Sequence, residues 1–445
     1  MAQSTVSKTR KIAPFIVLGI AFLIVGGYTL DEKMRPSLAN GPMVHLLEPD
    51  TLAVTWSAEP SFSIGKLHWT FPSGKTVLIE VEPVNGRCTA RLGGLMPGQT
   101  YSYRVSHDGF LGRSIPMSGP HEVSMPVPRG HPFRFLAFGD SGNGSNTQAA
   151  LARLMMRQDP DVIIHVGDLV YPAGAIDDYP HKFYEPNAEL IRSVPFMASL
   201  GNHDVATDKG QPLLDVFMLP ENGPDGIQPE RNYYFDYGDA RFVALDSNRD
   251  TEKGAISLDQ MKNVVGPWLR KVLSDCDARW KFVYFHHPFY TGSTHRAEGS
   301  AHLKEAFVDI FEQHGVDMVF WGHNHLYERT APIRQDRIVP DGQGVVYIVT
   351  GVGGVSRYPE AENPPEYIRA YNDEVFSFTR VDLSSDRLEL QQIDEYGNVI
   401  DEYSVSKPDA ARSPASASGV DEIADREEAM SVDSASHRLI GQCGL

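Results

Sequence analysis

Cysteine is scarce in this chain of 445 residues, which contains only Cys88, Cys276 and Cys443. Without a CxxC pair, neither a disulfide framework nor a cysteine-based metal site can be built. Basic residues are outnumbered as well, because 40 Lys and Arg stand against 58 Asp and Glu and give a formal net charge of −18. Nucleic-acid binding relies on basic patches that neutralise phosphates, so this charge balance predicts no nucleic-acid partner. It does not exclude small phosphorylated substrates, since a bound metal ion can reverse the field inside one cleft.

An uncharged, largely apolar run occupies residues 12–30, directly after a short basic segment that contains Lys8, Arg10 and Lys11. A basic flank before an apolar run is typical of export signals and predicts that the rest of the chain lies outside the cytoplasm. The run has nearly the length of about 20 residues that spans a bilayer, which favours a membrane anchor in residues 1–35. One proline and three glycines interrupt it, so a cleaved signal peptide is the alternative. The expected location is membrane-anchored, periplasmic or secreted.

Residues 36–128 have the pattern of a small all-β domain. Short runs rich in β-branched and aromatic residues, such as 52–56 and 101–105, alternate with turn clusters such as 96–98. Regular short strands over about ninety residues predict a β-sandwich. The strand around Trp56 and the segment 94–101 resemble fibronectin type III modules.

Residues 129–406 have a different pattern, in which apolar strand-like runs alternate with amphipathic helical stretches. Strands are expected at 133–138, 161–166 and 316–321, and helices near 149–157 and 303–314. This alternation predicts an α/β domain whose reactive loops follow the carboxyl ends of its strands. Residues 407–445 are rich in Ala, Ser, Asp and Glu with almost no aromatics. They are expected to form a largely disordered acidic tail with at most a short helix at 420–430.

Five polar clusters each follow a strand-like run of the α/β region. They are Phe-Gly-Asp-Ser-Gly at 138–142, Val-Gly-Asp-Leu-Val-Tyr at 166–171, Gly-Asn-His-Asp at 201–204, Val-Tyr-Phe-His-His-Pro at 283–288 and Gly-His-Asn-His at 322–325. Any one of them alone is more often an ordinary turn or helix cap. Two Asp, one Asn and three His among them supply the oxygen and nitrogen donors that metals such as zinc and iron bind. His323 and His325 are two residues apart, so on an extended segment they face the same side.

In this order, the five blocks resemble the metallophosphoesterase superfamily, and Tyr171 three residues after Asp168 narrows the resemblance to purple acid phosphatases. The resemblance implies an α/β fold with a β-sandwich flanked by helices, preceded here by the small all-β domain. It also implies one trivalent iron ion and one divalent ion of zinc, iron or manganese. The implied ligands of the iron are Asp140, Asp168, Tyr171 and His325. Those of the divalent ion are Asp168, Asn202, His286 and His323, with Asp168 shared.

The activity that the resemblance implies is hydrolysis of small phosphate monoesters by a metal-bound hydroxide. A tyrosine ligand fits a trivalent ion, because the phenol has an unperturbed pKa of about 10 and ionises beside a strong Lewis acid. His203 follows the predicted ligand Asn202 and is expected to bind the phosphate or to support the ligands. His295 is expected to donate a proton to the leaving group. His287 adjoins His286, but the spacing from Val283 selects His286 as the ligand.

Two alternatives remain open at this stage. The first is a phosphodiesterase or nucleotide pyrophosphohydrolase with the same metal centre, because substrate loops cannot be recognised from one sequence. The second is a surface binding protein that keeps an inert phosphatase-like domain. Metal content distinguishes the second from an enzyme, since an inert domain has no need of a metal pair.

Overall fold

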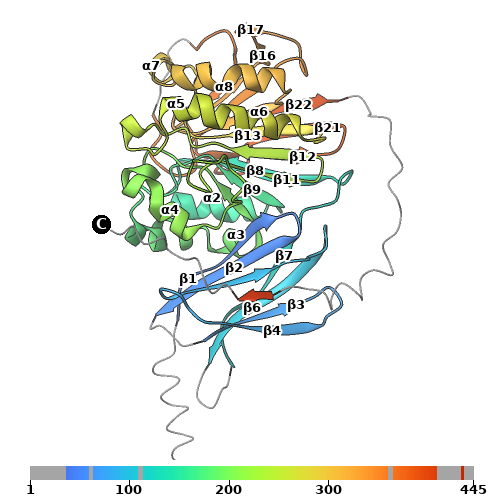
Figure 1. Cartoon of the computed structure of the whole chain (residues 1–445). Helices are drawn as coiled ribbons and strands as arrows, with labels where there is room; N and C mark the ends of the chain where they lie inside the picture. The colour runs from blue at the N-terminus through green and yellow to red at the C-terminus, as the bar shows by residue number, and fades with distance from the viewer. Residues whose placement is uncertain (1–36, 60–63, 109–113, 359–363, 408–431, 435–445) are drawn as a thin grey trace, which may run out of the picture.

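A computed structural model describes residues 37–59, 64–108, 114–358, 364–407 and 432–434. A β-sandwich formed by β1 to β7 lies below a larger α/β domain formed by β8 to β22 in the view of Figure 1. Within the described residues, no helix is both long and apolar enough to cross a membrane. The predicted N-terminal anchor in residues 1–35 lies outside them.

The β-sandwich consists of two four-stranded sheets with the strand orders β1-β2-β5-β23 and β4-β3-β6-β7. Its strands are β1 (Ser37–Glu48), β2 (Thr51–Glu59), β3 (Gly65–Thr70), β4 (Thr76–Val81), β5 (Arg87–Leu92), β6 (Thr100–Asp108) and β7 (Ser114–Ser124). Trp56 on β2 and Trp69 on β3 are both fully buried, and the Trp69 ring stacks on Tyr101 at 5.2 Å between centroids. The predicted all-β region therefore forms a two-sheet core.

A short strand of the C-terminal tail, β23 (Val432–Ser434), pairs antiparallel with β5. The sequence predicts disorder for this tail, but the outer edge of β5 presents backbone groups that a further strand can pair with. The helix expected at 420–430 lies outside the described residues.

The α/β domain is built on two large sheets. The six-stranded sheet has the order β10-β9-β8-β20-β21-β22, and the seven-stranded sheet has the order β11-β12-β13-β14-β18-β15-β19. The first contains β8 (Phe133–Phe138), β9 (Val162–His165), β10 (Phe196–Ala198), β20 (Ser377–Leu383), β21 (Arg387–Asp394) and β22 (Val399–Ser406). The second contains β11 (Tyr233–Tyr237), β12 (Ala240–Ala244), β13 (Trp280–Tyr284), β14 (Met318–Trp321), β15 (Tyr327–Thr330), β18 (Val346–Thr350) and β19 (Ile368–Asn372). A hairpin of β16 (Ile333–Arg334) and β17 (Arg337–Ile338) lies beside them.

The two sheets pack face to face through aromatic side chains. Phe135 of β8 lies 5.0 Å from Phe242 of β12 and 5.1 Å from Phe282 of β13, measured between ring centroids. Successive residues of a strand point to opposite faces, so Val243 and Val283 belong to a separate core on the other side of the seven-stranded sheet. The predicted β-sandwich of an α/β domain is therefore confirmed.

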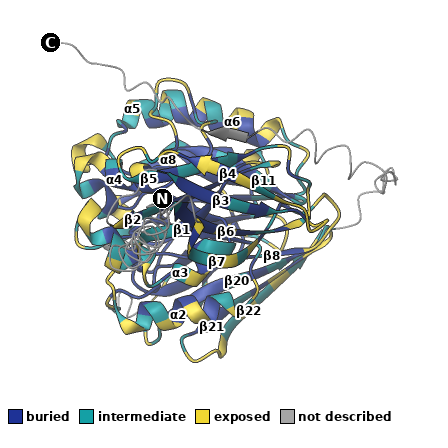
Figure 2. Cartoon of the chain, turned by 90° about the horizontal axis from the view of Figure 1, so that it is seen from below, coloured by how far each residue is buried: buried dark blue, intermediate teal, exposed yellow. Residues whose placement is uncertain are grey.

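Helices cover the outer faces of this sandwich, and they are marked by exposed and intermediate residues in Figure 2 while the strands are mostly buried. The α-helices are α2 (Asn146–Met156), α3 (Ala188–Ser193), α4 (Gln211–Val216), α5 (Leu258–Gln260), α6 (Gly266–Ser274), α7 (Thr294–Gly299) and α8 (Ala301–Gln313). Short 3₁₀ or π turns are η3 (Ile176–Asp178), η4 (Pro180–Tyr184), η5 (Asp204–Ala206), η6 (Asp208–Gly210), η7 (Asp250–Glu252) and η8 (Met261–Val265). The expected helices near 149–157 and 303–314 correspond to α2 and α8. The buried face of α8 is Leu303, Phe307, Ile310 and Phe311, as its apolar periodicity predicts.

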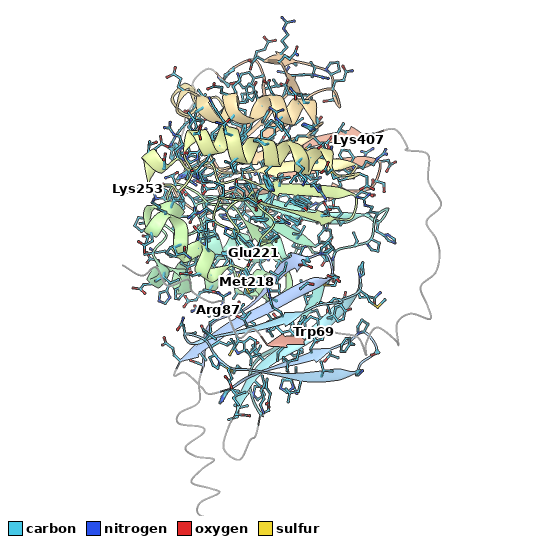
Figure 3. The ribbon with its side chains drawn as sticks, viewed as in Figure 1. Trp69, Arg87, Met218, Glu221, Lys253 and Lys407 are labelled. Atoms are coloured by element: carbon cyan, nitrogen blue, oxygen red, sulfur yellow. The ribbon has the colours of Figure 1, made fainter. Side chains whose placement is uncertain are left out.

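The two domains are joined by hydrogen bonds as well as by packing. Arg87 of β5 donates to the backbone carbonyls of Asp215 and Val216, the latter at 2.9 Å. Tyr103 Oη donates to the carbonyl of Arg192 at 2.7 Å. Figure 3 shows Arg87 and Met218 close together at this boundary. The small domain is thus fixed against the larger one.

Candidate metal centre

All seven predicted metal ligands follow strands at the carboxyl-terminal edges of the two sheets. β8, β9 and β10 run parallel to each other in one sheet, and β12, β13, β14 and β18 do so in the other. The side chains concerned are Asp140 after β8, Asp168 and Tyr171 after β9, Asn202 after β10, His286 after β13, and His323 and His325 after β14. Carboxyl ends of parallel strands meet at one edge of a sheet, which is where ligand sites of α/β proteins form.

Asp168 lies at the middle of this group. Its Oδ2 atom is 2.8 Å from Tyr171 Oη on one side and 3.3 Å from His286 Nε2 on the other. The Asp168 side chain is fully buried. One carboxylate oxygen therefore faces two separate sets of donor atoms.

The first set surrounds the phenol of Tyr171. Tyr171 Oη is 3.1 Å from Asp140 Oδ1 and 3.1 Å from His325 Nε2, and these two atoms are 3.4 Å apart. His325 Nδ1 donates to the carbonyl of Ser356, so Nε2 of the neutral ring is an acceptor. A single phenolic proton thus faces acceptors on Asp140, Asp168 and His325, an arrangement that a cation would satisfy.

The second set surrounds His286. Its Nδ1 donates to the carbonyl of Val166 at 2.9 Å, so in the neutral ring Nε2 is the acceptor, and it lies 3.1 Å from Asn202 Oδ1. The ring of His323 lies 5.0 Å from that of His286 between centroids. A carbonyl partner on the other ring nitrogen is the arrangement that orients histidine for metal binding.

Donor spacing and identity fit a metal pair. Bonds of about 2.0–2.2 Å from a metal to nitrogen and oxygen place neighbouring donors about 2.8–3.6 Å apart in octahedral or tetrahedral geometry. The measured separations of 2.8 to 3.4 Å within the two sets lie in this range. Ligand atoms of Asp140, Asp168 and His286 also lie within 4.8 Å of one another, as do those of His286, His287 and His323.

The buried carboxylates dominate the electrostatics of the site. Burial alone would lower the pKa of His286, but the charges of Asp168 and Asp140 raise it to about 9. Burial, and then the same two carboxylates, raise the pKa of Tyr171 well above its ordinary value. The pKa of His323 is lowered by burial and then by its neighbours His287 and His286. The carboxylate side of the centre therefore favours added positive charge.

Three of the predicted ligands have backbone conformations that are uncommon for residues with a side chain. Asp140, Asp168 and His323 have φ angles of 54°, 58° and 69°. Such left-handed conformations cluster at functional sites, where the surrounding structure maintains them. Here the carboxylate of Asp204 accepts the backbone N–H groups of Asp168 and Gly201, at 2.8 and 2.9 Å.

His203 lies at the mouth of the site. Its ring is 4.2 Å from that of Tyr171, its Nε2 is 4.0 Å from Asp168 Oδ2, and about a third of its side chain is exposed. Its backbone N–H donates to Asp168 Oδ1 at 2.8 Å. The second predicted catalytic residue, His295, is the second residue of α7, but its side chain lies outside the described part of the structure.

Three further residues lie at the site that the sequence analysis did not select. The His287 ring is 4.5 Å from that of His323, and its Nδ1 is 2.8 Å from Ser247 Oγ. Arg296 and Tyr358 contact His323 from the other direction. The sequence could have pointed to His287, because this residue is adjacent to the predicted ligand His286. Arg296 lies in α7 and Tyr358 in the loop after β18, and the sequence does not specify where either segment lies relative to the site.

Residues 133–327 match the family model described as calcineurin-like phosphoesterase. Purple acid phosphatase 15 of Arabidopsis thaliana is 29% identical over 295 residues, which cover 59% of this chain and 53% of that protein. Probable inactive purple acid phosphatase 24 of the same plant is 26% identical over 364 residues, which cover 72% of this chain and 57% of that protein. The chain thus spans little more than half the length of these relatives.

Among solved structures, purple acid phosphatase PPD1 from yellow lupin seeds superposes with a TM-score of 0.67. The match covers 83% of this chain and 74% of the lupin chain at 22% sequence identity. It therefore includes both the β-sandwich and the α/β domain and supports the same fold for both.

Proposed function

Because the chain belongs to the calcineurin-like phosphoesterase family, we propose that it is a metal-dependent acid phosphatase that hydrolyses small phosphate monoesters. The observation that carries this proposal is the Asp168 carboxylate, whose Oδ2 lies between the Tyr171 set and the His286 set. A shared carboxylate between two sets of nitrogen and oxygen donors is what a dinuclear centre requires.

We propose that trivalent iron is held by Asp140, Asp168, Tyr171 and His325. The divalent ion, which we propose to be zinc, iron or manganese, would be held by Asp168, Asn202, His286 and His323. The bound pair would supply Lewis acidity at the phosphoryl group and lower the pKa of a nucleophilic water. The tyrosine is the reason for assigning a trivalent ion, since burial and two carboxylates oppose its ionisation in the protein alone.

The chain itself would bind and orient the phosphate at the mouth of this centre. His203 is the residue best supported for that role, because its ring lies beside Tyr171 and is partly exposed. Its backbone N–H also fixes the orientation of the Asp168 carboxylate. His295 remains our proposed proton donor to the leaving group, a role that imidazole suits near neutral pH.

We also propose that residues 36–128 form a separate β-sandwich domain, that 129–406 form the catalytic domain, and that the protein works outside the cytoplasm. The basic and apolar sequence of residues 1–35 supports the last point. Membrane association would follow if this segment stays uncleaved.

The test is hydrolysis of 4-nitrophenyl phosphate by the full chain from acid to neutral pH, with metal analysis of the same sample. Asp168→Asn should lose turnover and metal together, because it removes the shared charged ligand. Asp225→Asn, at an exposed position, is the matched control. Full activity of Asp168→Asn would refute the assignment. A metal-free, inactive wild-type chain would instead support the alternative of a binding protein with an inert phosphatase-like domain.

A further inference from the structure

A cavity of about 550 Å³ is lined by residues of α8, of the β16–β17 hairpin, of the loop after β13 and of the segment that leads into β19. The hairpin and α8 lie next to each other in Figure 1. None of the seven predicted metal ligands lines this cavity. Its volume falls within the range of about 300–1,000 Å³ that small-molecule sites occupy. The cavity is therefore a candidate binding site separate from the metal centre.

The inner wall of this cavity is aromatic. Phe289 and Tyr290 are buried, with 5.4 Å between their ring centroids, and the ring of Tyr367 lies 5.8 Å from that of Tyr290. We call these three residues the aromatic wall. Ile333 of β16 is buried beside it, whereas its strand partner Ile338 is 40% exposed. An aromatic ligand would gain ring contacts with the wall and would cover the exposed part of Ile338.

Hydrogen bonds fix the shape of the cavity. Asp336, in the turn of the hairpin, accepts the Tyr290 hydroxyl at 2.5 Å and forms an ion pair with Lys304 of α8. The Lys304 ammonium also lies 4.7 Å from the centroid of the Tyr290 ring. Tyr367 Oη donates to the carbonyl of Thr291 at 3.0 Å. A cavity whose walls are already held in place loses little freedom when a ligand binds.

Two opposite charges at this cavity have no partner among the described residues. Arg337 of β17 and Glu366 before β19 are both exposed, and neither side chain forms an ion pair or a hydrogen bond there. Exposed charges are ordinary when they are scattered over a surface. Here they come from two segments that line one aromatic cavity, so they offer a donor for a carboxylate and an acceptor for an ammonium group.

We propose that this cavity binds a small aromatic zwitterion, which is a molecule with an aromatic ring, a carboxylate and an ammonium group. The ring packs on the aromatic wall. The carboxylate accepts hydrogen bonds from Arg337, whose planar guanidinium matches two carboxylate oxygens, and the ammonium group donates to Glu366. Lys304 and Asp336 compensate each other, so the cavity as a whole favours a ligand without net charge.

The test is ligand-observed NMR of the full chain with three probes at millimolar concentration. L-Tryptophan carries all three groups, tryptamine lacks the carboxylate, and indole-3-propionate lacks the ammonium group. L-Tryptophan should bind more tightly than either analogue by about twofold to tenfold, the range expected for partly exposed hydrogen bonds between charged groups. Absence of L-tryptophan binding, or equal affinity for the three probes, would overturn the inference.

Two variants at exposed positions separate the roles of the charges without disturbing the core. Arg337→Gln should weaken L-tryptophan and indole-3-propionate by about twofold to tenfold and leave tryptamine unchanged. Glu366→Gln should weaken L-tryptophan and tryptamine and leave indole-3-propionate unchanged. Arg334→Gln, at an exposed position of the same hairpin outside the cavity, is the matched control. A variant that weakens all three probes, or none, would contradict the assignment of its charge.

Excess inorganic phosphate distinguishes this cavity from the metal centre. Phosphate competes with a probe whose carboxylate binds metal ions, so it should displace none of the three probes from the cavity. Displacement of L-tryptophan would place this probe at the metal centre and overturn the inference. The readout does not require turnover, so an inactive chain that binds L-tryptophan in this pattern would refute the phosphatase proposal and leave the cavity assignment intact.

Discussion

His45 of the β-sandwich accepts the backbone N–H of Met218 of the catalytic domain at its Nδ1 atom, over 3.2 Å. Its Nε2 lies 2.9 Å from Thr55 Oγ1. Because Nδ1 accepts, the ring is neutral in the folded protein and carries its proton on Nε2. Burial, and then the charge of Arg87, lower the pKa of His45 well below 6.5. Protonation of His45 at Nδ1 would therefore break a hydrogen bond between the two domains.

Acid should therefore weaken the contact between the domains. A histidine whose folded pKa is lowered contributes stability that is fully present above its unfolded pKa of about 6.5 and is lost as pH falls towards the folded value. Each such group makes the free energy of unfolding fall by at most about 1.4 kcal/mol per pH unit in that window. Urea unfolding at several pH values between 8 and 5 measures how steeply the free energy of unfolding falls with pH.

His45→Asn separates this contribution from that of other buried histidines. The Asn oxygen can replace Nδ1 as acceptor for Met218 but does not titrate, so the variant should be less stable at pH 8 and less sensitive to acid. His131→Asn, at an exposed position, is the control. An unchanged slope in His45→Asn would show that this ring does not titrate on unfolding.

The sequence groups the predicted ligands because each of them follows a strand whose apolar pattern is clear. The sequence predicts a strand at 133–138, the bounds that β8 has, and Asp140 lies two residues beyond it. The parallel strands β8 and β9 bring Asp140 and Asp168 to one edge of their sheet. His286 follows β13 of the other sheet and joins them because the two sheets pack face to face. The sequence could not predict the partner of His45, because the angle between two domains depends on side-chain packing over the whole boundary.

Asp204→Asn should cost stability and metal together. The Asp204 carboxylate accepts four backbone N–H groups at 2.8 to 3.3 Å, those of Asp168, Leu169, Val170 and Gly201. An amide would turn its NH₂ group towards two of these donors and leave them buried without an acceptor, at about 1–3 kcal/mol each. We expect a loss of about 2–6 kcal/mol in the free energy of unfolding on the same scale, together with reduced metal content. Asp225→Asn is the exposed control, and a variant as stable as this control would contradict the prediction.

Gly201→Ala tests how closely the backbone approaches Asp168. A Cβ at residue 201 would lie 2.1 Å from Asp168 Oδ1 and 2.2 Å from Asp168 N, so the ligand must move. Overpacking of this kind costs about 1–3 kcal/mol, and we expect metal content and turnover to fall with it. Gly299→Ala is the control, because a Cβ there meets no atom within 4 Å. Normal metal content in Gly201→Ala would mean that Asp168 tolerates displacement.

Arg296 illustrates what sequence pattern alone does not identify. It lies in the short helix α7, which the sequence analysis does not predict, and Glu328 of β15 accepts hydrogen bonds from the loop before that helix. The spacing from Val283 selects His286 over the adjacent His287, yet both rings lie close to His323. Side-chain direction within an irregular loop is decided by such long-range hydrogen bonds.

Glu328→Gln should reduce catalysis while metal binding is retained. Both carboxylate oxygens accept a hydrogen bond, from Thr291 Oγ1 and from Gly292 N, and the amide nitrogen of Gln cannot accept either. Asn324 Nδ2 already donates to the Thr291 hydroxyl at 2.7 Å, so that hydroxyl has little freedom to reverse its role. We expect a loss of about 1–3 kcal/mol in the free energy of unfolding and lower kcat, because the loop leads to His295 and Arg296 but contributes no predicted metal ligand. Steady-state kinetics together with metal analysis checks this prediction. Glu305→Gln, at an exposed position, is the control. Loss of metal from Glu328→Gln would show instead that the loop supports the metal ligands themselves.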